Sequence, residues 1–94
     1  MKVNEIISKE TRTDIILSGI NIYKVLGELL TSHLHIIIPL LCELMISQEP
    51  YIDNILRLNI VNLFKILTNK CSFTVYHLNQ IVSCLVLGNI LIFN

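Results

Sequence analysis

The stretch LSGINIYKVL at residues 17–26 is followed, forty-one residues later, by the similar stretch LNIVNLFKIL at residues 58–67. Four positions are identical at this spacing, namely Leu17/Leu58, Asn21/Asn62, Lys24/Lys65 and Leu26/Leu67. Two leucine-rich helices can resemble each other by chance, but chance does not readily place the same Asn and the same Lys at one spacing. The paired stretches therefore predict an internal repeat.

A weaker match follows at a spacing of forty-two residues, where His35/His77 and Cys42/Cys84 are identical. For these segments a chance likeness remains open. A longer loop between helices would account for the difference of one residue between the two spacings. Two helical segments in each unit and a period near 41 fall within the range of about 40–47 residues that HEAT and armadillo repeats show.

Apolar residues recur at helical spacing in four segments, and sustained period-2 alternation is missing from the sequence. The predicted helices cover residues 14–30, 33–46, 51–69 and 73–87, with Gly88 ending the last of them. The predicted fold is therefore all-α, an α-solenoid of about two HEAT-like or armadillo-like hairpins. The units are residues 13–46 and 50–87, between an N-terminal flank at 1–12 and a truncated apolar tail at 88–94.

Capping and proline signals refine these predictions. Thr13 or Asp14 is expected to cap the first helix with a side-chain oxygen. Pro39 predicts either a kink in the second helix or a start delayed towards it, because proline lacks a backbone donor. Pro50 suits the first position of the third helix, and Asp53 is an alternative cap.

A narrow polar stripe marks one face of the first and third predicted helices. Its members recur every three or four residues, which places them on one side of each helix. The residues singled out as possibly partner-facing are Asn21, Lys24, Glu28, Asn62 and Lys65. Most of the remaining circumference is apolar, so we expect the stripe to be an outward ridge of helices packed on several sides.

The composition is apolar for so short a chain. Of 94 residues, 53% are hydrophobic and only 15% are charged, against about 25% charged in ordinary domains. We expect another protein surface or a membrane to cover the excess. The formal net charge of +0 gives no basic footprint for nucleic acid. The N-terminus resembles neither a secretory signal nor a transit peptide, so a cytoplasmic location is expected, with the nucleus as an alternative.

Residues 71–93 are long enough to cross a bilayer, and they offer an alternative role as a membrane anchor. Polar residues interrupt this segment at His77, Asn79, Gln80, Ser83 and Asn89. Since polar side chains are costly at membrane depth, buried protein helices are the preferred interpretation and membrane association is the alternative.

Candidate chemistry is sparse. Cys42, Cys71 and Cys84 have no CxxC spacing and are interpreted as reduced, mostly buried thiols. His33 and His35 point in different directions on a helix, so they do not easily share a metal ion. A Cys84–His77 pair would lack an oxyanion hole and an orienting third group. We therefore predict no catalytic residue, no metal and no cofactor.

The segment HLHIIIPLLCEL at residues 33–44 resembles a helix in the HEAT-repeat solenoid of target-of-rapamycin (TOR) serine/threonine kinases. There the pattern is Tyr-Leu-His, three aliphatics, Pro and an aliphatic run that ends in Leu, and His33 replaces the aromatic residue. The flanking helices keep a similar order over residues 13–87. The resemblance implies a solenoid segment of a large kinase of the phosphatidylinositol-3-kinase-related family.

The TOR kinase motifs do not occur in this sequence, and the tail LGNILIFN departs from the family pattern. The expected function is thus a non-catalytic scaffold for protein partners or neighbouring repeats, in a chain that looks like a slice from a longer stack. Self-association through apolar ends is a further expectation, since about three units are normally needed for stability.

Overall fold

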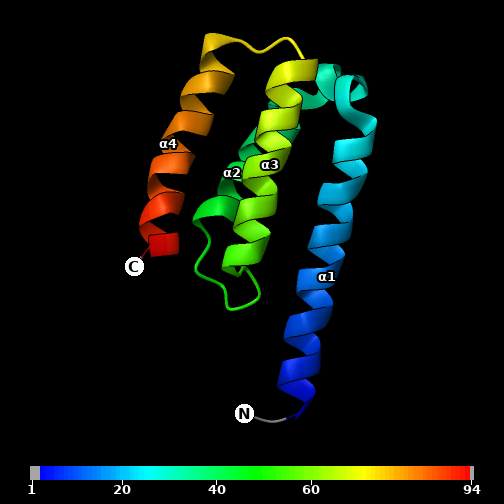
Figure 1. The fold of residues 1–94 in the computed structure, drawn as a ribbon, viewed down its shortest axis with the longest axis vertical. Coiled ribbons are helices and arrows are strands. Elements are labelled where there is room, and N and C mark those ends of the chain that lie inside the picture. The colour runs from blue at the N-terminus through cyan, green and yellow to red at the C-terminus, as the bar shows by residue number, and fades with distance from the viewer. Residues whose placement is uncertain (1–2, 94) are drawn as a thin grey trace.

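The computed structural model describes the backbone of residues 3–93 and the side chains of residues 8–87, and the described chain is helical without strands (Figure 1). Its elements are α1 (Val3–Leu26), the 3-10 helix η1 (Gly27–His33), α2 (Leu34–Ile46), α3 (Asn54–Lys70) and α4 (Val75–Phe93). The predicted all-α class is confirmed.

Successive helices run in opposite directions, so α1 and α3 point one way and α2 and α4 the other (Figure 1). Helix α1 packs against α3, and α2 packs most extensively against α4. Helix α3 also contacts α2 and α4. As a result, α2 and α3 form the centre of the molecule, while α1 and α4 lie at opposite edges (Figure 1).

The core is drawn mainly from the two central helices. Their side chains less than one-tenth exposed include Leu34, Ile37, Ile38, Leu41 and Met45 of α2, and Leu56, Ile60, Leu63, Phe64 and Leu67 of α3. The edges contribute far less: Ile20 from α1, and Ile81 with Cys84 from α4. Burial of apolar side chains at these spacings is what holds the four helices together.

Helix α1 ends at Leu26, directly before Gly27, whereas the sequence pattern predicted that it would continue to Leu30. The φ of +50° at Gly27 is a left-handed conformation that glycine adopts without the steric cost of a Cβ. Gly27 is buried, and a Cβ added there would lie 3.0 Å from Lys70 Cδ. The chain therefore turns at Gly27, and η1 carries it across to α2.

Helix α1 begins at Val3, not near Asp14, so the predicted cap at Thr13 or Asp14 is wrong. Thr13 lies inside the helix, where its hydroxyl reaches back to the Lys9 carbonyl at 3.0 Å. The same hydroxyl lies 2.7 Å from the Tyr51 carbonyl in the α2–α3 loop. Thr13 thus ties α1 to that loop.

Helix α2 contains Pro39 but begins at Leu34, so the start is not delayed to the proline. The C-terminal end of α2 is held by Arg57, whose side chain reaches across from α3. Its Nε donates to the Met45 carbonyl at 3.2 Å, and its Nη2 donates to the Ser47 carbonyl. A guanidinium at the negative end of a helix dipole satisfies carbonyls that the helix leaves free.

Side chains cap both remaining helices. Asp53 accepts a hydrogen bond from the Leu56 amide at 2.8 Å, which confirms it as the α3 cap in place of Pro50. Thr74 Oγ1 accepts from the His77 amide at 3.2 Å at the start of α4. Helix α4 continues to Phe93, so the predicted stop at Gly88 is wrong. An isolated glycine costs a helix only about 1 kcal/mol, and aliphatic residues follow it.

Candidate functional site

The outer side of α4 carries an unbroken apolar stripe. Val75, Leu78, Val82 and Val86 are all exposed, and their spacing of three and four residues places them on one face. Val75 is 73% exposed. The opposite face of α4 packs on α2 and α3 through Ile81 and Cys84, so this stripe points away from the molecule.

The outer side of α1 has a second exposed apolar surface, at the other edge of the molecule. It consists of Ile15, Ile22 and Val25, together with Leu29 of η1. Val25 is 85% exposed, the largest fraction among the large apolar side chains described. We call these two surfaces the α4 stripe and the α1 stripe.

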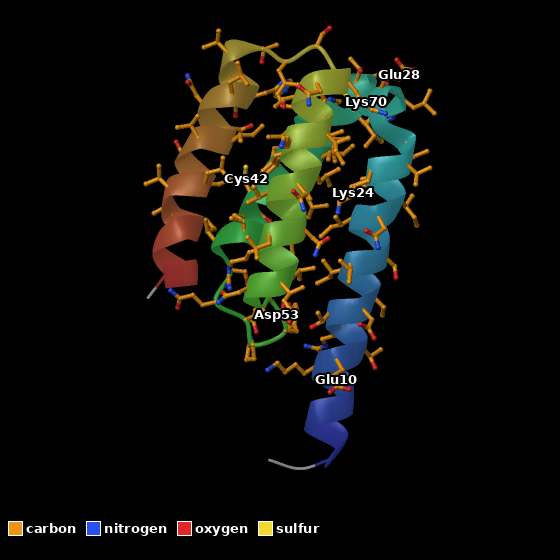
Figure 2. The ribbon with its side chains drawn as sticks, viewed as in Figure 1. Glu10, Lys24, Glu28, Cys42, Asp53 and Lys70 are labelled. Atoms are coloured by element: carbon orange, nitrogen blue, oxygen red, sulfur yellow. The ribbon has the colours of Figure 1, made fainter. Side chains whose placement is uncertain are left out.

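The residues of the predicted polar stripe differ in their exposure and in the helix to which they belong. Asn21, Asn62, Lys65 and Glu28 are exposed, although Glu28 belongs to η1 and not to the helix that carries Asn21. Lys24 is half-buried, and its Nζ donates to Asn59 Oδ1 of α3 at 3.0 Å (Figure 2). Lys24 therefore joins α1 to α3, whereas its repeat equivalent Lys65 faces solvent.

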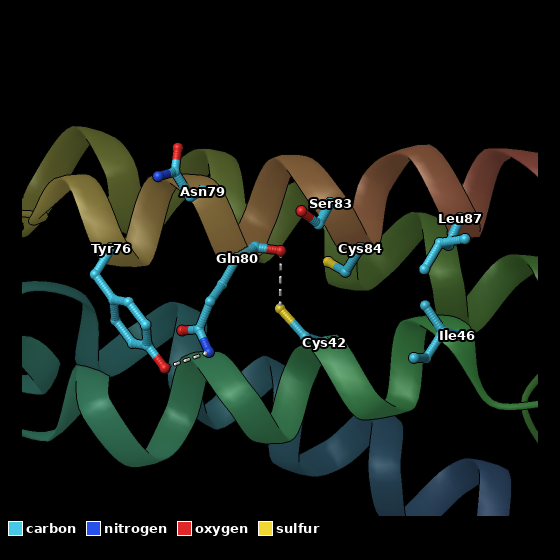
Figure 3. Close-up of a pocket in the computed structure, with 8 residues that line it drawn as sticks. All are labelled: Cys42, Ile46, Tyr76, Asn79, Gln80, Ser83, Cys84 and Leu87. Atoms are coloured by element: carbon cyan, nitrogen blue, oxygen red, sulfur yellow. Dashed lines mark hydrogen bonds between the residues drawn. The ribbon is translucent and has the colours of Figure 1, made fainter.

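A groove of about 380 Å³ lies between α2 and α4 (Figure 3). Its walls are Cys42 and Ile46 of α2 and Tyr76, Asn79, Gln80, Ser83, Cys84 and Leu87 of α4. Gln80 Nε2 donates to Tyr76 Oη at 3.3 Å, while Gln80 Oε1 is buried without a hydrogen-bond partner. The groove is therefore mostly apolar.

Two thiols meet at the inner wall of this groove. Cys42 Sγ donates to the Gln80 carbonyl at 3.6 Å (Figure 3). Gln80 lies one helical turn before Cys84 in α4. A hydrogen bond with the Cys84 thiol lowers the pKa of Cys42 and outweighs the opposing effect of burial. The same hydrogen bond, burial and the nearby Cys42 charge raise the pKa of Cys84. The first proton of the pair thus leaves more easily than the second.

The sequence signal for this pair was the match of Cys42 with Cys84 at a spacing of forty-two residues. Interpreted as isolated thiols, the two cysteines gave no hint of contact. Cys84 is buried, but Cys42 and Cys71 are half-buried, so burial of the cysteines is less complete than expected. Cys71 lies elsewhere, with Sγ 3.5 Å from the Gly27 carbonyl.

The residues considered for metal binding are apart in the structure. His33 and His35 are both exposed, and His33 Nδ1 lies 3.0 Å from the Ser32 hydroxyl. Over residues 8–87, no three His, Cys, Asp or Glu side chains gather closely enough to hold a metal ion.

By length and composition alone, one helical stretch in the described chain could cross a membrane, Ser8–Ile46, and a third of its apolar window is buried. This stretch comprises most of α1, all of η1 and all of α2, and the chain reverses direction within it (Figure 1). The helix at the expected anchor is shorter in its apolar part, Val75–Leu87. The finding is weak evidence for a membrane protein.

Comparison of the chain with protein-family models, with curated proteins and with solved structures finds no match.

Proposed function

We propose that this chain is a non-catalytic protein-interaction segment of two helical hairpins, whose α1 and α4 stripes are covered by other helices. The main support for this proposal is the α4 stripe. Its residues Val75, Leu78, Val82 and Val86 form one uncharged exposed face. Exposed apolar patches of this kind are typical of interaction sites. A cytoplasmic location accords with three free cysteines in the chain.

The pairing of the helices supports a repeat interpretation. Helices α1 and α3, which contain the two similar decapeptides, lie side by side and parallel (Figure 1). The same holds for α2 and α4, and the repeat-equivalent Cys42 and Cys84 line the groove between them. Stacking of one hairpin on the next brings equivalent residues together in this way. An α-solenoid related to TOR kinases remains a proposal built on the sequence.

We propose that a second copy of the chain binds to the α4 stripe and covers it. The stripes at the two edges are both apolar and uncharged, so the α1 stripe of one copy can cover the α4 stripe of the next. Inside one molecule, α4 already accepts a helix on its inner side through similar aliphatic contacts. Such head-to-tail contacts do not close on themselves and yield a range of oligomers.

Sedimentation velocity of the full chain over a range of concentrations tests this proposal. We expect wild type to form species larger than a monomer, and the double variant Val82→Glu/Val86→Glu to become monomeric. Gln48→Glu adds the same kind of charge on the exposed α2–α3 loop and is expected to leave association unchanged. A wild type that stays monomeric at every concentration would overturn the choice of occupant.

Liposome flotation separates the protein-interaction role from the alternative of a membrane anchor at residues 71–93. Under the proposal, the chain stays in the aqueous fraction with neutral vesicles. Flotation of wild type that Val82→Glu/Val86→Glu abolishes would contradict a protein partner and favour a lipid surface.

A further inference from the structure

The paired thiols of Cys42 and Cys84 have a geometry that neither the repeat nor the interaction surfaces require. They come from different helices, α2 and α4, and line the same groove (Figure 3). Both are free thiols. Because Cys42 Sγ also reaches the backbone of α4 at Gln80, the two helices approach closely at this point.

The two thiols differ in access. Both residues line the groove, but Cys42 is half-buried whereas Cys84 is only 4% exposed (Figure 3). The volume of about 380 Å³ lies within the range of small-molecule sites.

We propose that Cys42 and Cys84 form a dithiol site that reduces a small-molecule disulfide entering the α2–α4 groove. Cys42 is the attacking residue because it is accessible and loses its proton first. Cys84 is the resolving residue because it is the buried thiol of the same groove, on the facing helix α4. The proposal is independent of the interaction function, since neither thiol belongs to the α1 or α4 stripe.

The reaction consists of two exchanges. The Cys42 thiolate attacks one sulfur of the disulfide R–S–S–R, the S–S bond breaks, and R–S⁻ leaves and takes up the proton that Cys42 lost. Cys84 then loses its proton, and its thiolate attacks Cys42 Sγ in the mixed disulfide. The second R–S⁻ leaves as R–SH. The two cysteines are oxidised to one disulfide, and the small disulfide is reduced to two thiols.

The product would link α2 to α4 and close a loop of the chain between residues 42 and 84. Cross-linking a loop of this length removes entropy from the unfolded chain, so oxidation is expected to raise the midpoint of thermal unfolding by about 20 °C. The site would thereby couple the thiol–disulfide balance of the surroundings to the stability of the helix pair.

The test incubates the reduced full-length chain with glutathione disulfide and maps the products by non-reducing peptide mass spectrometry. We expect a Cys42–Cys84 cross-link within one molecule, with the loss of two hydrogens. Cys71→Ser should react as wild type does. Cys84→Ser should stop at a mixed disulfide on Cys42, and Cys42→Ser should react at least tenfold more slowly at this site.

The map of wild type alone decides the matter if a cysteine variant fails to fold. A parallel reaction in denaturing urea, where the fold no longer selects the pair, should scatter cross-links among all three cysteines. Modification of Cys71 alone, or a native-state map as scattered as the one in urea, would overturn the proposal.

Discussion

The centre of the molecule and its edges each pair a strongly apolar helix with a more polar one, α2 with α3 and α4 with α1, yet the fold uses them differently. Among the side chains that the structure describes, eight large apolar ones are almost wholly buried, and all of them belong to α2 or α3. The most exposed large aliphatic side chains belong mainly to α1 and α4. Hydrophobicity therefore sets which segments are helical, and position in the stack sets which apolar face is covered within the molecule.

The largest effect is expected where the two regions differ most. Leu63 in α3 is fully buried, so Leu63→Ala should cost about 2–5 kcal/mol of unfolding free energy through lost contacts and a cavity. The edge counterpart Ile22→Ala should cost less than about 0.5 kcal/mol in a chain dilute enough to be monomeric, because Ile22 is exposed there. Urea titration followed by circular dichroism measures both. Equal losses would erase the distinction between centre and edge.

Arg57 tests how the centre is held together at the α2–α3 turn. Arg57 is only 6% exposed, and its guanidinium satisfies two carbonyls at the end of α2. Arg57→Met keeps the apolar stem but leaves these carbonyls unpaired, and it should cost about 2 kcal/mol. Arg12, an exposed residue of α1 that stacks on Tyr51, is the matched control, and Arg12→Met should cost well under half as much. Similar losses in denaturant titrations would refute this role for Arg57.

Gly19 of α1 and Gly27 at the start of η1 should respond to alanine with opposite signs. Gly27→Ala places a Cβ at a left-handed φ and against Lys70, and it should destabilise by about 1–2 kcal/mol. Gly19 lies inside the helix with open space around it, so Gly19→Ala should stabilise by about 0.5–1 kcal/mol. Thermal melts of the two variants suffice. Destabilisation by both would mean that the turn at Gly27 is not the special position.

The smallest effect concerns the contact of the edge helix α1 with the centre. A double-mutant cycle on Lys24→Met and Asn59→Ala should give a coupling of about 0.5–1 kcal/mol, because their hydrogen bond spans α1 and α3. Lys65→Met is the control on the exposed repeat equivalent, and it should be neutral and uncoupled to Asn59. Coupling of the same size for both lysines would show that neither contact is specific.

The centre of the fold could be predicted better than its ends. Helical periodicity in LNIVNLFKIL and in HLHIIIPLLCEL located the cores of α3 and α2, and Asp53 marked the α3 cap. The start of α1 was misplaced by eleven residues, since Thr13 looks like a cap but bonds within the helix and to the loop. Gly27 indicates where α1 ends, but the apolar pattern continues past this glycine to Leu30. The end of the helix was therefore placed too late.

Contacts between distant segments lay beyond single-sequence reasoning. The polar stripe was found from spacing alone, but spacing does not reveal that α3 lies beside Lys24, so that residue seemed to be part of a free ridge. Arg57 carried no pattern to distinguish a buried guanidinium from an exposed one. The lag of forty-two did connect Cys42 with Cys84, and only the parallel packing of α2 and α4 turns that equivalence into contact.

Hydrogen exchange measured at low and high protein concentration tests the central claim most directly, because it reports each helix separately. If other molecules cover the α1 and α4 stripes, amides of α1 and α4 gain protection as concentration rises, while amides of α2 and α3 are already protected when the chain is dilute. The Val82→Glu/Val86→Glu variant should lose the gain in both α1 and α4, because it is expected to stay monomeric. Protection that is independent of concentration in both edge helices would contradict the account.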